Sequence, residues 1–213
     1  MIAYCAADEK YFELYFDLWA DQMNKYYPEF EKRIAVYEPS ERIRNRCREK
    51  NIICVNAMLE EHKQKDRTEI FNKFYLLRWR NLPMVDDLVL ETQINCLPVR
   101  TQHFPKDNNG VEQYRISRPK RGTLGGVSAA VFTPTACKKV VAVSKVMLYY
   151  PPNNDHPMNM WQLENLSHQL IKAEHQIHNF DKEKIPEYTY WITARTANKW
   201  THQQKVEVLR NNL

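Results

Sequence analysis

The sequence is poor in glycine, with 4 among 213 residues, where average usage near 7% would give roughly fifteen. A glycine-rich phosphate loop is therefore not expected, which excludes most P-loop and dinucleotide-binding enzymes. No run of uncharged apolar residues is long enough for a transmembrane helix. The first residues lack the basic and long apolar regions of a signal peptide. We therefore expect a cytoplasmic protein, or one of the host cytoplasm or virion if it is viral.

Paired cysteine motifs are also missing, because the five cysteines include no Cys-x-x-Cys spacing. An odd number of such residues favours reduced thiols over a disulfide framework or a zinc site. Cys5 and Cys54 lie in apolar runs, which is typical of inert core thiols. The chain also lacks a large net charge. The net charge of +5 permits an anionic ligand without requiring nucleic acid.

A hydrophobic fraction of 43%, with 12% aromatic residues, is sufficient for a folded core. The length predicts one domain over residues 1–213. Apolar runs predict strands at 2–7, 34–37, 52–55, 87–94, 125–132 and 188–193, and periodic apolar positions predict helices at 12–26, 42–50, 70–82, 134–147 and 160–180. The polar stretch 100–123 predicts a long loop, and a polar, basic segment follows residue 193.

Strands alternating with helices indicate an α/β protein with a mainly parallel central sheet flanked by helices. Ligands of such sheets bind beyond the carboxyl ends of the strands. The residues to consider first are therefore 6–11, 91–95 and 125–128.

Several of these segments, taken in order, resemble the nucleotide-sugar glycosyltransferases of the GT-A fold, which is Rossmann-like. The closest resemblance is to the retaining galactosyltransferase and glycogenin-like group. Residues 6–11 are similar to the first strand and turn of that family, and 71–94 resemble the run into its Asp-x-Asp motif. Residues 125–132 resemble its acceptor-side glycine loop, and 191–199 resemble a C-terminal segment that reaches the diphosphate.

The resemblance implies a UDP-type sugar donor, a glycan or other acceptor, and Mn²⁺ or Mg²⁺ as the metal. The nucleotide would be bound by Ala6, Asp8, Tyr11, Arg195 and Lys199. The sugar and acceptor side would be formed by Gly125, Gly126 and Ser128. Candidates for approach to the anomeric carbon are Gln162, Glu164 and Asn165.

The Asp-x-Asp position reads Glu91-Thr92-Gln93 in this chain. Alternation places Glu91 and Gln93 on one face of the strand. Hard cations prefer anionic oxygen ligands, and Gln93 offers only a neutral carbonyl oxygen. Either protein cations such as Arg195 and Lys199 neutralise the diphosphate, or the protein keeps the fold without sugar transfer.

Each candidate also has a structural interpretation. Asp8 suits the N-cap of the following helix, and Tyr11 suits core packing. Gly125 and Gly126 suit a tight turn. Arg195 and Lys199 suit an exposed surface.

Two further patterns carry weaker functional interpretations. His175 and His178 lie three residues apart on the predicted helix 160–180, but matching metal ligands at a telling spacing are missing. The arginines at positions 42, 44, 46 and 48 suit a solvated helix face or a phosphate backbone. The sequence thus leaves three hypotheses: an active glycosyltransferase, which we favour; a catalytically silent GT-A-like structural or binding protein; and a nucleic-acid-binding protein.

Overall fold

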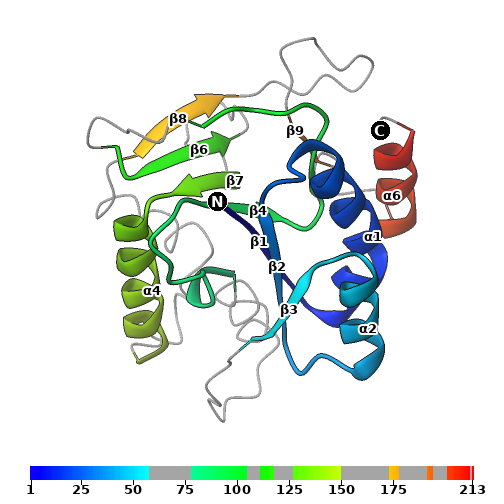
Figure 1. Ribbon diagram of the computed structural model, residues 1–213, viewed down its shortest axis with the longest axis horizontal. Helices are drawn as coiled ribbons and strands as arrows, with labels where there is room; N and C mark the ends of the chain where they lie inside the picture. Colours follow the sequence, from blue (N-terminus) through cyan, green and yellow to red (C-terminus); the bar gives the residue numbers. More distant parts are fainter. Residues whose placement is uncertain are drawn as a thin grey trace, which may run out of the picture.

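The computed structural model describes residues 1–57, 78–104, 111–117, 127–149, 173–177, 191–193, 201–211 and 213. Within these residues, a seven-stranded sheet has the order β3-β2-β1-β4-β7-β6-β8 (Figure 1). Its strands are β1 (Ile2–Ala7), β2 (Glu31–Val36), β3 (Ile53–Asn56), β4 (Val89–Gln93), β6 (Gln113–Ser117), β7 (Val127–Phe132) and β8 (Ala173–Ile177). Four neighbouring strands, β3, β2, β1 and β4, are parallel. β7 runs antiparallel to β4 and β6, and β8 is parallel to β6. The predicted mainly parallel α/β sheet is confirmed.

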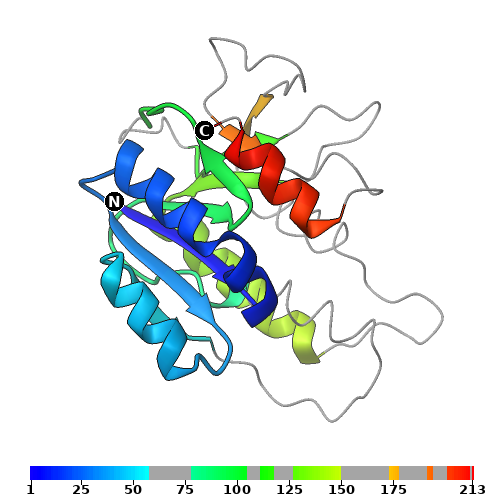
Figure 2. The same cartoon turned by 90° about the vertical axis from the view of Figure 1, so that its right-hand side faces the viewer.

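Helices cover both faces of this sheet (Figure 2). One face carries α1 (Glu9–Tyr26), α2 (Glu41–Glu49) and α6 (His202–Arg210), and the other carries α4 (Pro134–Tyr149). On the first face, Phe16 and Trp19 of α1 pack with Ile43 of α2 in one buried cluster. On the second face, Ala136 and Val140 of α4 belong to a separate cluster. None of the helices in the described parts of the chain combines the length and hydropathy that a membrane span requires.

Strand β4 separates the two clusters through its alternating side chains. Leu90 packs in the α1 cluster, and Val89 packs in the α4 cluster. The indole Nε1 of Trp19 donates to Thr92 Oγ1 at 2.8 Å, which fixes α1 over this strand. A buried hydroxyl thus gains the partner that it would otherwise lack.

A short antiparallel pair, β5 (Cys96–Pro98) with β9 (Trp191–Thr193), lies beside the main sheet. The Trp191 indole donates to Gln102 Oε1 at 3.0 Å, and the Gln102 backbone N–H donates to Tyr27 Oη at 3.1 Å. The Trp191 and Tyr27 rings stack with centroids 5.9 Å apart. These contacts join the strand pair to the C-terminal end of α1.

Side-chain hydrogen bonds cap the starts of two further helices. Thr133 accepts from the Ala136 backbone N–H at 3.2 Å, as expected for an N-cap followed by Pro134. At α6, Thr201 and Gln204 form a reciprocal capping box.

Two sequence-based assignments are wrong. The predicted loop 100–123 contains β6, and the predicted helix 160–180 contains β8 at Ala173–Ile177. Glu174 and His175 are therefore strand residues. β6 pairs with both β7 and β8, so backbone hydrogen bonds from distant segments override the local pattern. The C-terminal segment contains α6.

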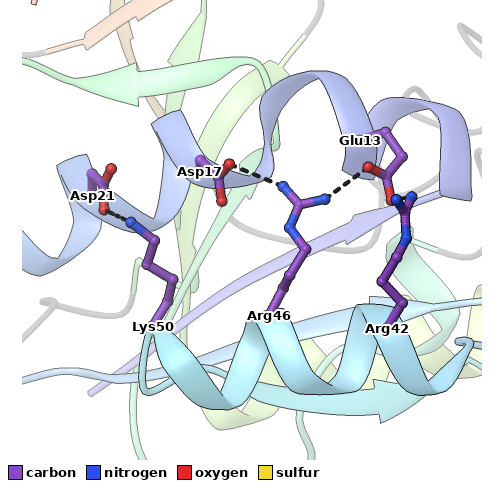
Figure 3. A network of polar contacts seen from close by, with 6 residues as sticks. All are labelled: Glu13, Asp17, Asp21, Arg42, Arg46 and Lys50. Atoms are coloured by element: carbon purple, nitrogen blue, oxygen red, sulfur yellow. Dashed lines mark hydrogen bonds and ion pairs between the residues drawn. The ribbon is translucent and has the colours of Figure 1, made fainter.

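The arginine-rich segment forms α2, whose basic side chains meet acidic side chains of α1 (Figure 3). The guanidinium of Arg46 donates to Glu13 at 2.7 Å and to Asp17 at 3.0 Å, and it lies over the Phe12 ring. The full network joins Glu13, Asp17 and Asp21 to Arg42, Arg46 and Lys50. This pairing supports the solvated-face interpretation of the arginine run.

We expect Arg46→Ala to lower the free energy of unfolding by about 1 kcal/mol, because it removes two ion pairs and an aromatic contact. Arg48→Ala is the matched control, since Arg48 is 68% exposed and pairs with the 71% exposed Glu41. Urea unfolding at low and high salt measures both changes. Equal losses for the two variants would contradict the prediction.

Candidate functional site

The carboxyl ends of the four parallel strands lie at one edge of the sheet. In the register, Ala6 is opposite both Ala35 of β2 and Gln93 of β4. β7 enters the sheet at this edge, because its residue Ala129 pairs with Thr92 and Ser128 lies one residue nearer the edge. The structure therefore brings together the backbones of Ala6, Gln93 and Ser128. A ligand of an α/β sheet is expected at such an edge.

Asp8 follows β1 directly and is the N-cap of α1. Its Oδ1 accepts the Tyr11 backbone N–H at 2.7 Å. The capping interpretation of Asp8 is therefore satisfied by the structure, and the cap holds its carboxylate at the edge of the sheet. Whether it also binds a nucleobase stays a prediction.

Tyr11 belongs to an aromatic group with Tyr15 of α1 and His202 of α6. Its ring lies 5.7 Å from that of Tyr15 and 5.3 Å from that of His202. Tyr15 Oη and His202 Nδ1 share a hydrogen bond of 3.3 Å. Burial raises the pKa of Tyr15 to about 12, so its hydroxyl stays protonated. This group places the N-terminus of α6 beside the start of α1.

Sequence reasoning did not find this contact, although the Thr201-x-x-Gln204 spacing is a local signal for a helix start. Burial lowers the pKa of His202, and the nearby charges of Lys10 and Lys205 lower it further. The two basic residues near His202 are thus Lys10 of α1 and Lys205 of α6.

Glu91 lies in the interior and not at the rim. It is 0% exposed and is opposite Tyr4 in the register. Asp8 lies four residues beyond Tyr4, which is about 13 Å along the strand direction. Burial and the charge of Glu91 raise the pKa of Tyr4, and Arg78 opposes this effect.

Both carboxylate oxygens of Glu91 accept from one guanidinium. Arg78 Nη2 donates to Oε2 at 2.5 Å, and Arg78 Nε donates to Oε1. The Arg78 residue is itself 5% exposed and lies over the Trp79 ring. A bidentate pair of this kind satisfies two buried charges together. A cation held by Glu91 would have to displace Arg78 and enter the protein interior.

The described residues do not fit a carboxylate-held divalent cation at this position. Gln93, two residues further along β4, is half-buried at the edge and offers only a neutral amide. Among the described ranges, His, Cys, Asp and Glu side chains form no group of three that could hold a metal ion.

Of the remaining predicted site residues, the structure describes one. Ser128 is placed by its backbone in β7. The others lie outside the described residues: Gly125, Gly126, Gln162, Glu164, Asn165, Arg195 and Lys199.

Comparison with known proteins identifies the fold. No protein-family model and no curated protein sequence matches the chain. Among solved structures, the chain is similar to the apo form of the glycosyltransferase GlyE of Streptococcus pneumoniae, with a TM-score of 0.56, 10% identity and coverage of 81% of this chain and 44% of that one. The chain is also similar to an active-site mutant of LgtC, with a TM-score of 0.53, 14% identity and coverage of 99% of this chain and 96% of that one. It is similar as well to a glycosyltransferase involved in glycosylation of the major capsid of PBCV-1, with a TM-score of 0.52, 9% identity and coverage of 98% of each chain.

These likenesses show that the chain has a GT-A-like glycosyltransferase fold. Because the sequence identities are only 9–14%, these likenesses show a shared fold and nothing finer. The chain spans less than half the length of GlyE.

We expect Glu91→Gln to lower the free energy of unfolding by about 3–5 kcal/mol, because Arg78 would be left as an uncompensated buried charge. Gln93→Ala on the same strand is the control, with an expected loss of about 1 kcal/mol. The double variant Arg78→Met with Glu91→Leu should recover most of the loss. Urea unfolding gives all three values, and a stable Glu91→Gln variant would refute a structural role for the pair.

Stability should also depend on the protonation of His202. Since folding lowers the pKa of His202, the folded state binds fewer protons there than the unfolded state. Its contribution is full above the unfolded value of about 6.5 and is lost as the pH falls. We expect His202→Gln to lose less stability than the parent between pH 7 and pH 5. Parallel pH profiles for the two proteins would argue against this contribution.

Proposed function

We propose that the protein binds a UDP-type nucleotide sugar at the carboxyl edge of the sheet and transfers the sugar to an acceptor. One observation carries the proposal: nearly the whole chain overlaps two glycosyltransferase structures from end to end. Membership of the retaining galactosyltransferase and glycogenin-like group is part of the proposal, resting on the order of the resembling segments. A small transferase of this kind suits viral or bacterial surface glycans.

The edge supplies groups that suit such a donor. Ala6 is partly exposed at the end of β1, where its small side chain faces the α4 side of the sheet, and the half-buried Tyr11 packs on the α1 side with Ala7. We assign the nucleotide to this side, with Asp8 at the base. Gln93 would then face the diphosphate or the sugar. The roles of Arg195 and Lys199, and of the residues on the acceptor side, stay predictions.

The charge of the diphosphate must be met by some cationic group. Because Arg78 occupies both oxygens of Glu91, we propose that basic side chains supply this charge in place of a metal held at Glu91. Lys10 and Lys205 lie close enough to His202 to lower its pKa, next to the proposed nucleotide side.

A second candidate is a GT-A-like protein that binds without transferring sugar, as a structural or binding component of an assembly. The observation that favours it is the same buried ion pair, which removes one carboxylate from the Asp-x-Asp position.

Titration calorimetry with UDP and UDP-sugars, in Mn²⁺ and in EDTA, tests both candidates. We expect binding in EDTA with an affinity within about threefold of that in Mn²⁺, because Glu91 is paired internally. Release of UDP from a bound UDP-sugar would support transfer, and binding without release would support the second candidate. Failure to bind any nucleotide would overturn the proposed site.

Tyr11→Ala should weaken nucleotide binding by about tenfold, which corresponds to the loss of one base–aromatic contact. Tyr26→Ala is the matched control, because Tyr26 lies at the opposite end of α1. An equal affinity for the two variants would remove Tyr11 from the site.

A further inference from the structure

Two cysteines meet where α2 turns into β3. Cys47 lies in the last turn of α2, and Cys54 is the second residue of β3. The Ile52 backbone N–H donates to the Cys47 carbonyl at 2.8 Å, and Asn51 adopts a left-handed backbone with φ of 56°. This tight turn returns the chain across the end of the helix. As a result, the two side chains face the same cluster under α1.

The two thiols are neighbours, and a hydrogen bond between them is the largest cause of the pKa shift of each. Their surroundings differ, because Cys47 is buried and Cys54 is partly exposed. The hydrogen bond from Cys47 lowers the pKa of Cys54, partial burial opposes it, and the charge of Arg44 lowers it further. The same hydrogen bond, together with burial, raises the pKa of Cys47.

This asymmetry assigns different chemical roles to the two thiols. A thiolate is the nucleophilic form of cysteine, and it is favoured by a hydrogen-bond donor and a nearby guanidinium. Cys54 has both, and it is the partly exposed member of the pair. Cys47 is protonated and adjacent, which is the position of a thiol that resolves an oxidised neighbour.

We propose that Cys47 and Cys54 form a reversible redox site, in which a hydroperoxide oxidises Cys54 and Cys47 closes an intramolecular disulfide. In the first step, the Cys54 thiolate attacks hydrogen peroxide. The O–O bond breaks, a sulfenic acid forms and hydroxide leaves. In the second step, the Cys47 sulfur attacks the Cys54 sulfur, the S–O bond breaks, and the thiol proton leaves with the hydroxyl group as water. A dithiol reductant reverses the reaction by thiol–disulfide exchange.

The other cysteines provide internal controls. Cys5, Cys96 and Cys137 are buried. Burial raises the pKa of Cys137 to about 12, with the charge of Glu91 as a second cause, so its thiol is protonated at neutral pH. The proposed redox site shares no residue with the proposed nucleotide site.

The full chain, treated with one equivalent of hydrogen peroxide, should lose the mass of two hydrogen atoms. Peptide mapping should locate the new bond between Cys47 and Cys54, and dithiothreitol should restore the original mass. Cys137→Ser is the matched control and should form the same disulfide at the same rate. Absence of this disulfide in the folded protein, or a bond between two chains in its place, would overturn the proposal.

Single variants separate the two roles. In Cys47→Ser, dimedone should trap a sulfenic acid at Cys54, because the resolving thiol is gone. In Cys54→Ser, alkylation of Cys47 by iodoacetamide at neutral pH should be about tenfold slower than alkylation of Cys54 in the parent, since the thiolate is the reactive form. Circular dichroism confirms that each variant is folded. Faster reaction at Cys47 than at Cys54 would refute the assignment.

Discussion

The buried pair of Arg78 and Glu91 is the constraint on which both the sheet and its chemistry depend. A carboxylate on a central strand has no water to solvate it, and only a bidentate guanidinium supplies two hydrogen bonds and the opposite charge together. Arg78 belongs to the segment that precedes β4 and is not itself in the sheet. Its pairing with Glu91 therefore holds that segment against the face of the sheet on which α4 packs. The same contact withdraws Glu91 from the edge at which we propose that a nucleotide sugar binds.

The edge of the sheet therefore lacks the pair of carboxylates that would hold a divalent cation at the Asp-x-Asp position, because Glu91 is buried and Gln93 is a neutral amide. Its described polar groups include the N-cap carboxylate of Asp8 and the amide of Gln93, and Lys10 and Lys205 lie near His202. α6 reaches this edge through aromatic contacts between His202 and two tyrosines of α1. The C-terminal helix thus contributes to the surroundings of the proposed nucleotide, although it is far from β1 in the sequence.

Helix α1 connects these features. Its inner face packs on the sheet through Trp19 and Thr92, and its acidic side chains meet the bases of α2. By holding α2 in place, α1 also positions the turn that brings Cys47 and Cys54 together. One helix thereby supports the proposed ligand edge at its N-terminus and the thiol pair along its side.

Elements whose signals are local could be predicted from the amino-acid sequence. The apolar periodicity of α1, the Thr133 cap of α4 and the apolar run of β1 are each signals carried by neighbouring residues of one segment, so the α/β class and the central parallel strands were predictable. The remaining features depend on contacts between segments that are distant in the sequence. β6 and β8 are strands because distant partners satisfy their backbones. Glu91 is paired rather than exposed because Arg78, thirteen residues earlier, reaches it only in the folded chain. Such choices depend on contacts between separate elements, which a local pattern does not encode.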